Sequence, residues 1–127
     1  MLPPAALRLR NLTTARRPHP RPRAVPAARV APGAVAALSS KVAIALAKPE
    51  RYVMVALATD RAMSFGGSAE PCAYAELVSV GGFRDTRKLS ADLTPALAEG
   101  LGVAPERLYL KFTAVAGADF GWNGSTF

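Results

Sequence analysis

Residues 63–82 read MSFGGSAEPCAYAELVSVGG, and this stretch decides the fold class of the chain. Its first glycine pair tolerates positive φ and predicts a turn. Pro71 then keeps the residue before it extended, because the proline ring excludes the helical conformation there. The apolar run over residues 73–80 ends at a second glycine pair, which predicts a buried strand between two turns. The lysine and serine or threonine of a phosphate-binding loop are absent, so the stretch is not such a loop.

A strand–helix–strand order extends from this stretch in the direction of the C-terminus. Asp85 is a suitable N-cap for a helix after the strand. Leucines then recur at helical spacing: Leu89, Leu93 and Leu97. Residues 108–113 alternate between two faces, which predicts the closing strand of the unit.

The same order is visible upstream, but without its opening strand. Residues 33–47 carry apolar side chains at helical spacing, and residues 52–58 form an almost unbroken apolar strand. We therefore predict two strand–helix–strand units, the first of which has its first strand missing or replaced. Such a loss would leave ladder groups unpaired in the middle of the sheet, at a cost of several kcal/mol.

The first 32 residues are rich in arginine and proline and contain no acidic residue. We treat them as a leader and residues 33–127 as the folded domain. Three interpretations remain open: an organellar transit peptide, a disordered basic tail, and an atypical start. A transit peptide would place the protein in a plastid or a mitochondrion.

The charge of the chain is unevenly distributed. Nine of its sixteen basic residues and none of its nine acidic residues lie in residues 1–49. The folded part therefore has no basic excess with which to bind nucleic acid, and we expect no nucleic-acid partner. No apolar run approaches the length of a membrane helix, so we expect no membrane partner. No metal or cofactor is expected either.

Several ordered motifs carry a family resemblance: ERYVMVAL, MSFGGSAEPCAYAELVSVG, RLYLKF and the closing GWNGSTF. Together they resemble the macrophage migration inhibitory factor and D-dopachrome tautomerase family, in particular plant or algal members, over residues 33–127. The resemblance implies an α/β (α+β) tautomerase-like fold, with one four-stranded mixed sheet and two helices on one face. It also implies a homotrimer, or a hetero-assembly with homologues, with active sites between subunits.

The resemblance implies keto–enol isomerisation of small aromatic acids of the phenylpyruvate or L-dopachrome type. Lys48 matches the lysine that meets the substrate carboxylate, and it is the catalytic candidate. Val80 matches a substrate-binding backbone N–H, Tyr109 a tyrosine from the neighbouring subunit, and Lys111 a more variable position. The aromatic rim of the site is matched by Tyr52, Phe120, Trp122 and Phe127. Without the family, Lys48 is a solvated lysine at a helix end and the aromatic residues are an apolar tail. Cys72 matches the first cysteine of a Cys-x-x-Cys motif, but Ala75 replaces the second, so that thiol chemistry is not expected.

In the family the base is an N-terminal proline, whose amine is neutral at the working pH. Family spacing puts this proline at Arg17, next to Pro18, and the proline base is therefore absent in register. We accordingly predict impaired isomerase activity. The alternatives are a non-catalytic, cytokine-like or partner-binding member, and a divergent product that folds poorly alone. Apart from an organelle, the family implies a cytoplasmic protein or one secreted by a non-classical route.

Overall fold

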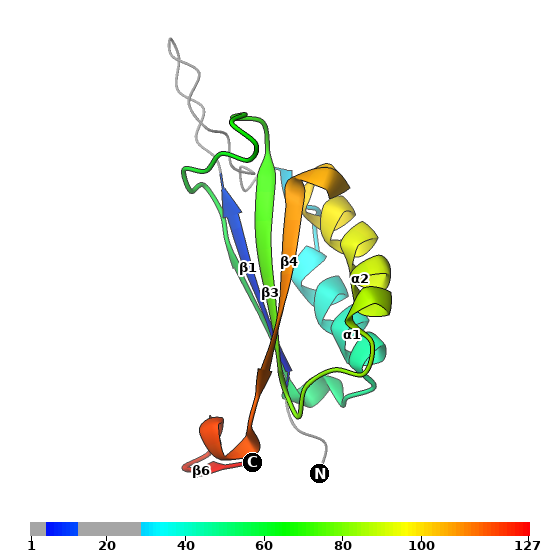
Figure 1. Cartoon of the computed structure of the whole chain (residues 1–127), viewed down its shortest axis with the longest axis vertical. Coiled ribbons are helices and arrows are strands. Elements are labelled where there is room, and N and C mark those ends of the chain that lie inside the picture. Colours follow the sequence, from blue (N-terminus) through cyan, green and yellow to red (C-terminus); the bar gives the residue numbers. More distant parts are fainter. Residues whose placement is uncertain (1–4, 13–28) are drawn as a thin grey trace.

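The computed structural model describes residues 5–12 and 29–127, and within them two helices cover one face of a four-stranded sheet (Figure 1). The main elements are β1 (Ala5–Leu12), α1 (Ala34–Leu46), β2 (Val53–Ala58), β3 (Cys72–Val80), α2 (Thr86–Leu101) and β4 (Leu108–Val115). The shorter elements are the 3₁₀ helices η2 (Glu50–Tyr52), η3 (Pro105–Arg107) and η4 (Gly117–Asp119), and the strands β5 (Gly121–Trp122) and β6 (Ser125–Thr126).

The sheet is mixed, with the strand order β2-β1-β3-β4. β1 runs parallel to β2 and β3 runs parallel to β4, while the central pair β1 and β3 is antiparallel. Each parallel pair is joined through one helix, α1 or α2, so the sheet consists of two strand–helix–strand units. The predicted fold class is therefore confirmed.

The expectation that the first strand is missing is wrong. Residues 5–12, which we had assigned to the leader, form β1 in the centre of the sheet, paired on both sides. Ala5, Leu7 and Leu9 alternate toward the helices and are each 1% exposed, while Arg8 lies on the opposite, exposed face. This period of two is the ordinary pattern of a strand with one covered face. The strand was not predicted because the segment around it is rich in proline.

The hydrophobic core lies between the helices and the sheet. α1 contributes Leu38 and Val42, and α2 contributes Leu93, Leu97 and Leu101, all of them at most 2% exposed. These residues pack with the inward side chains of the four strands. Because β1 supplies part of this cluster, the core depends on residues that precede the predicted domain.

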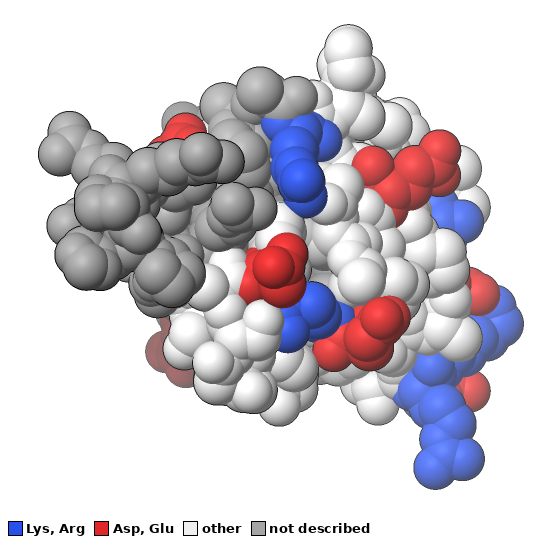
Figure 2. Space-filling view, turned by 90° about the horizontal axis from the view of Figure 1, so that it is seen from above, with Lys and Arg blue, Asp and Glu red and all other residues white. Residues whose placement is uncertain are grey.

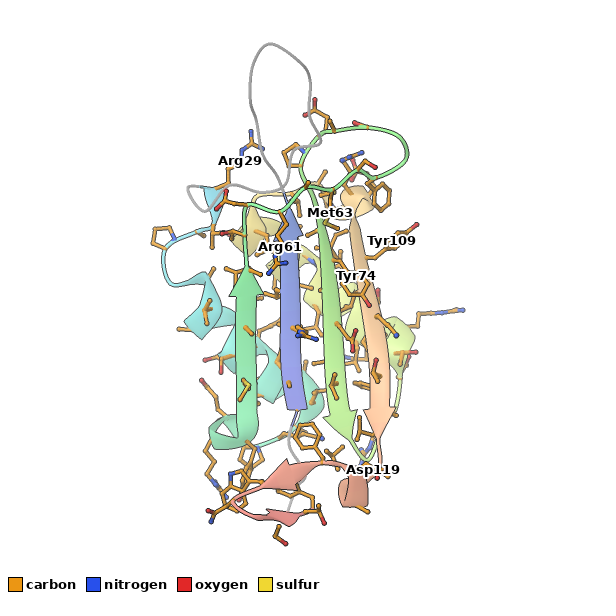
Figure 3. The ribbon with its side chains drawn as sticks, turned by 90° about the vertical axis from the view of Figure 1, so that its left-hand side faces the viewer. Arg29, Arg61, Met63, Tyr74, Tyr109 and Asp119 are labelled. Atoms are coloured by element: carbon orange, nitrogen blue, oxygen red, sulfur yellow. The ribbon has the colours of Figure 1, made fainter. Side chains whose placement is uncertain are left out.

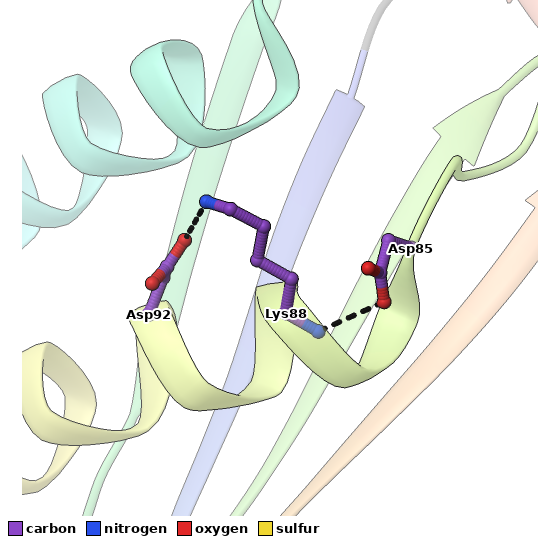
Figure 4. Close-up of polar contacts among 3 residues, drawn as sticks. All are labelled: Asp85, Lys88 and Asp92. Atoms are coloured by element: carbon purple, nitrogen blue, oxygen red, sulfur yellow. Dashed lines mark hydrogen bonds and ion pairs between the residues drawn. The ribbon is translucent and has the colours of Figure 1, made fainter.

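The two helices begin and end at recognisable signals. Asp85 caps α2, where its carboxylate accepts a hydrogen bond from the backbone N–H of Lys88 at 3.0 Å, as the sequence predicted (Figure 4). One turn further, the ammonium group of Lys88 forms a salt bridge with Asp92 at 2.9 Å. α1 ends in a left-handed residue, Ala47, which turns the chain so that Lys48 leaves the helix toward the sheet.

The face of the sheet opposite the helices is open in the single chain (Figure 3). Met54 on β2 is 69% exposed and Tyr109 on β4 is 65% exposed, although both side chains are largely apolar. Acidic and basic side chains are interspersed on the end of the molecule seen in Figure 2. Among the described residues, no helix has both the length and the apolar character needed to span a bilayer.

Candidate functional site

Lys48 lies at one end of the sheet, where both its backbone and its ammonium group form hydrogen bonds. Its backbone N–H donates to the carbonyl of Ala43 at 2.9 Å, which closes the C-terminus of α1. Its ammonium group donates to the hydroxyl of Ser79 at 2.7 Å and to the carbonyl of Val80 at 3.0 Å. Partial burial lowers the pKa of Lys48 below its ordinary value. The structure thus positions one cation beside the last residues of β3.

The first residue of β1 meets this cation through Ser79. Ala5 is paired with Ser79 in the antiparallel ladder, and with Val53 of β2 on its other side. The chain therefore enters its central strand next to the residue that binds the Lys48 ammonium group. Pro3 and Pro4 directly precede Ala5 in the sequence. The expected base position, Arg17 with Pro18, lies outside the described residues.

A cavity of about 240 Å³ opens beside the start of β1. It is lined by Ala5, Ala6, Arg51, Tyr52, Val53, Met54, Phe120, Gly121, Trp122 and Phe127. All four residues predicted for the aromatic rim are in this set, although they come from η2 and from the C-terminal tail. The structure therefore brings the predicted rim together, and we call this cavity the aromatic pocket.

The C-terminal tail folds back to form the wall of the aromatic pocket. The backbone N–H of Phe127 donates to the carbonyl of Gly117 at 3.1 Å and to that of Phe120 at 3.3 Å. The rings of Trp122 and Phe127 stack with centres 5.9 Å apart, and Tyr52 meets both of them edge-on. Aromatic pairs at such distances contribute stability beyond that of burying their surface. The wall is therefore held by ring contacts as well as by backbone hydrogen bonds.

Lys48 also lines a second cavity, of about 520 Å³, on the helix side of the sheet end. The same cavity is lined by Val80, by residues that lead into α2, including Arg84, and by the first turns of α2, including Lys88 and Asp92. The Lys48 ammonium group and the Val80 carbonyl are therefore adjacent, and the contact of the Val80 N–H with a substrate stays a prediction. The cavity beside Lys48 and the aromatic pocket have no lining residue in common. They are connected through Ala5, which lines the aromatic pocket and is paired with Ser79, the residue that binds Lys48.

Tyr109 and Lys111 lie on the exposed face of β4, away from Lys48 of the same chain. In the β3–β4 ladder Tyr109 is paired with Tyr74 near one end, whereas Val80 is paired with Val115 at the other. The Tyr109 ring packs instead on Phe65, with ring centres 4.9 Å apart. A single chain thus does not bring Tyr109 to the Lys48 end of the sheet.

Sequence reasoning missed two residues of this region, Ser79 and Arg51, and a third, Arg107, at the opposite end of the sheet. Ser79 is completely buried and accepts the hydrogen bond from Lys48; its position directly before Val80 was the available signal. Arg51 lines the aromatic pocket, and its place directly before Tyr52 was the available signal. Arg107 binds four backbone carbonyls and lies close to Cys72, whose buried thiol has a raised pKa because of desolvation. No local pattern indicates that arginine.

The residues that the structure describes contain no group of three histidine, cysteine or carboxylate side chains that could hold a metal ion. The site is thus a lysine ammonium at a sheet end, the start of an inner strand, and an aromatic pocket closed by the C-terminal tail. Together with the two-unit sheet, these features define an α+β protein of the tautomerase superfamily.

Comparison with known proteins agrees. The family model for macrophage migration inhibitory factor (MIF) matches residues 22–127, and the chain belongs to this family. The chain is 38% identical to macrophage migration inhibitory factor of Meriones unguiculatus over 105 residues, which cover 81% of this chain and 91% of the relative. It is 44% identical over 84 residues to the homolog from Trichinella spiralis, covering 65% and 74% of the two chains.

Solved structures of this family also match the fold. The structure of the protein from Trichinella spiralis aligns with a TM-score of 0.77 at 33% identity, covering 98% of this chain and 100% of that one. The homologue from Prochlorococcus marinus aligns with a TM-score of 0.78 at 31% identity, covering 96% and 98%. Because these alignments include nearly all of this chain, β1 has a counterpart in a complete family fold.

Proposed function

We propose that the protein is a keto–enol tautomerase for small aromatic keto acids of the phenylpyruvate or dopachrome type. The observation that carries the proposal is the Lys48 ammonium group, bound to Ser79 and Val80 next to the first residue of β1. A cation fixed there can hold the carboxylate of a substrate and stabilise the negative charge of its enolate. The aromatic pocket, also lined by Ala5, is suited to the substrate ring.

The base in this proposal is Pro4, presented as an N-terminal secondary amine. It directly precedes Ala5, and Ala5 is buried beside Ser79. A neutral amine at that position would take the α-proton of the keto acid onto its nitrogen, leaving the enolate, and would return a proton to the enolate oxygen to give the enol. If this amine comes close to the Lys48 cation, that cation would disfavour a second positive charge and so keep the amine neutral near pH 7.

We further propose that the complete site forms between copies of the chain in a trimer. Met54 and Tyr109 are exposed on the open face of the sheet, and such apolar exposure is typical of an association surface. Tyr109 lies at the end of β4 remote from Val80, so it would serve the site of a neighbouring copy. Lys111, two residues further along the same face, would accompany it.

The start of the chain is the variable that tests the proposed catalysis. Two forms are compared, one beginning at Met1 and one beginning at Pro4, with phenylpyruvate enolisation followed by its ultraviolet absorbance. General base catalysis contributes about 10²- to 10⁴-fold, so we expect the Pro4 form to be faster by at least about 100-fold. A third form, in which alanine replaces Pro4 as the first residue, controls for the trimming itself. Equal rates in the Met1 and Pro4 forms would refute the assignment of Pro4.

The impaired isomerase inferred from the sequence becomes a conditional proposal: the form that retains Met1 is inactive. A folded trimer without turnover in any form would favour the cytokine-like or partner-binding alternative. For location, we propose that residues 5–12 stay attached in whichever compartment the protein occupies, because β1 is part of the core. Mass spectrometry of the mature N-terminus shows whether Met1 is retained and whether β1 stays attached.

A further inference from the structure

The aromatic pocket contains a single cation. Among the side chains of the described residues that line it, that of Arg51 is the only charged one, and the others are apolar, aromatic or glycine. Arg51 is exposed, as are Met54 and Trp122 of the wall, so its attraction for an anion is partly screened by solvent. The charged side chain of the pocket therefore favours an anionic group.

The guanidinium group of Arg51 is held against the aromatic wall. Its central carbon lies 4.8 Å from the centre of the Tyr52 ring, within the range of a cation–π contact. Tyr52 in turn meets Trp122 edge-on with ring centres 6.1 Å apart. These contacts restrict the arginine side chain, so that less conformational entropy is lost when a ligand binds to it.

The charge of Arg51 has no carboxylate partner among the described residues, where the only salt bridge joins Lys88 and Asp92. Glu50 is adjacent in sequence, but its carboxylate accepts hydrogen bonds from the hydroxyls of Ser39 and Ser40 at 3.2 and 3.0 Å. The acid is thus directed toward α1. The donors of the guanidinium remain available to a ligand oxygen.

We propose that Arg51 binds an acidic substituent on the aromatic ring of the ligand. This inference rests on the proposed function, which already assigns the keto acid carboxylate to Lys48. The substrate class is then an aryl keto acid with a second acidic group, such as a carboxylate, on the ring. A volume of about 240 Å³ accommodates one substituted benzene ring and little more.

Binding of two isosteric ligands tests the proposal without any turnover. The probes are terephthalate, a dianion, and 4-carbamoylbenzoate, which replaces one carboxylate by an amide of the same shape. Trp122 is the only tryptophan of the chain and lines the aromatic pocket, so its fluorescence reports binding directly. The full chain beginning at Pro4 is titrated with each ligand in low salt, because salt screens a partly exposed ion pair.

We expect the wild-type protein to bind terephthalate about three- to tenfold more tightly than 4-carbamoylbenzoate, as a charge-assisted contact would provide. Arg51→Gln should reduce this ratio to about one, and Arg51→Lys should keep part of it. Arg87→Gln, an exposed arginine on α2, is the matched control and should keep the full ratio. A ratio near one in the wild type, an unchanged ratio in Arg51→Gln, or no Trp122 response to either ligand would each overturn the proposal.

The same variants separate this inference from the proposed catalysis. If the protein turns over 4-carboxyphenylpyruvate and phenylpyruvate, Arg51→Gln should raise KM for the first about three- to tenfold and leave KM for the second unchanged. An Arg51-dependent preference for the dianion without any turnover would contradict the tautomerase proposal while supporting the Arg51 subsite. Turnover of both substrates with no effect of Arg51→Gln would support the tautomerase proposal and contradict the Arg51 subsite.

Discussion

The guanidinium carbon of Arg107 lies over the ring of Phe65, 5.4 Å from its centre. The nitrogens of the same group donate to four backbone carbonyls of the segment between β2 and β3. These are the carbonyls of Phe65, Ser68, Glu70 and Pro71, at 3.3, 3.2, 2.9 and 3.0 Å. Phe65 also packs on Tyr109, so one side chain of η3 determines the shape of this segment and the surroundings of Tyr109.

Replacement of Arg107 should therefore destabilise the protein. Arg107→Lys keeps the charge, but a single ammonium group cannot reach four carbonyls arranged around a planar fork. We expect the free energy of unfolding to fall by about 2 to 3 kcal/mol, since hydrogen bonds from a charged group are lost and carbonyls are left without a donor. Urea denaturation measures the change, with Arg87→Lys on the surface of α2 as the control. Equal stability of the two variants would show that Arg107 does not hold the segment.

Removal of residues 1–32 should abolish folding. This deletion takes away β1, which is paired on both sides, together with the buried Leu7 and Leu9. The exposed edges of β2 and β3 and the opened core would cost far more than the 5–15 kcal/mol that stabilises a typical domain. Far-UV circular dichroism and size-exclusion chromatography of the form beginning at Gly33 check this, with the form beginning at Pro4 as the control. A folded product would mean that cleavage at the predicted leader boundary is compatible with the fold.

Gly117→Ala should detach the C-terminal tail from the aromatic pocket. A Cβ atom at this position would come within 2.5 Å of the Phe127 carbonyl oxygen, closer than real contacts allow. We expect a red shift of the Trp122 emission and faster proteolysis of the last residues, because the stacked rings lose their anchor. Gly121→Ala is the matched control, since its Cβ would meet the Ser125 carbonyl oxygen at 3.5 Å, an ordinary contact. An unchanged spectrum in Gly117→Ala would contradict the anchoring role.

Lys48 should make folding stability depend on pH on the alkaline side. Burial lowers the pKa of Lys48 in the folded state below the 10.5 of an unperturbed lysine, so the unfolded chain binds this proton more tightly. Stability should therefore rise as the pH increases from the lowered pKa toward 10.5. Chemical denaturation between pH 8 and about 10.5 measures this, and Lys48→Met should remove that contribution.

Over the same range, wild-type affinity for benzoate should fall as the ammonium charge of Lys48 is lost. Affinity that stays constant would exclude Lys48 as the partner of the carboxylate.

Much of the fold could be read directly from the chain. Both helices, the outer strands and the Asp85 cap follow from local periodicity and capping chemistry, and they lie within a few residues of the predicted bounds. The neighbouring positions Lys48 and Val80, and the aromatic side chains of the tail, were recognised through family motifs. The helices, strands and cap were accessible because each depends on residues close together in the sequence, whereas Lys48, Val80 and the tail aromatics depended on the family resemblance.

Only the tertiary structure decided the role of the first residues and the composition of the site. The alternation of Ala5, Leu7 and Leu9 is too short to identify a strand beside so many prolines, and its ladder partners lie far away in β2 and β3. The aromatic pocket likewise joins residues 5–6, 51–54 and 120–127, including Arg51. Sequence determines local conformation through nearby side chains, whereas strand pairing and cavity lining are decided when distant segments compete to bury apolar surface and pair backbone groups.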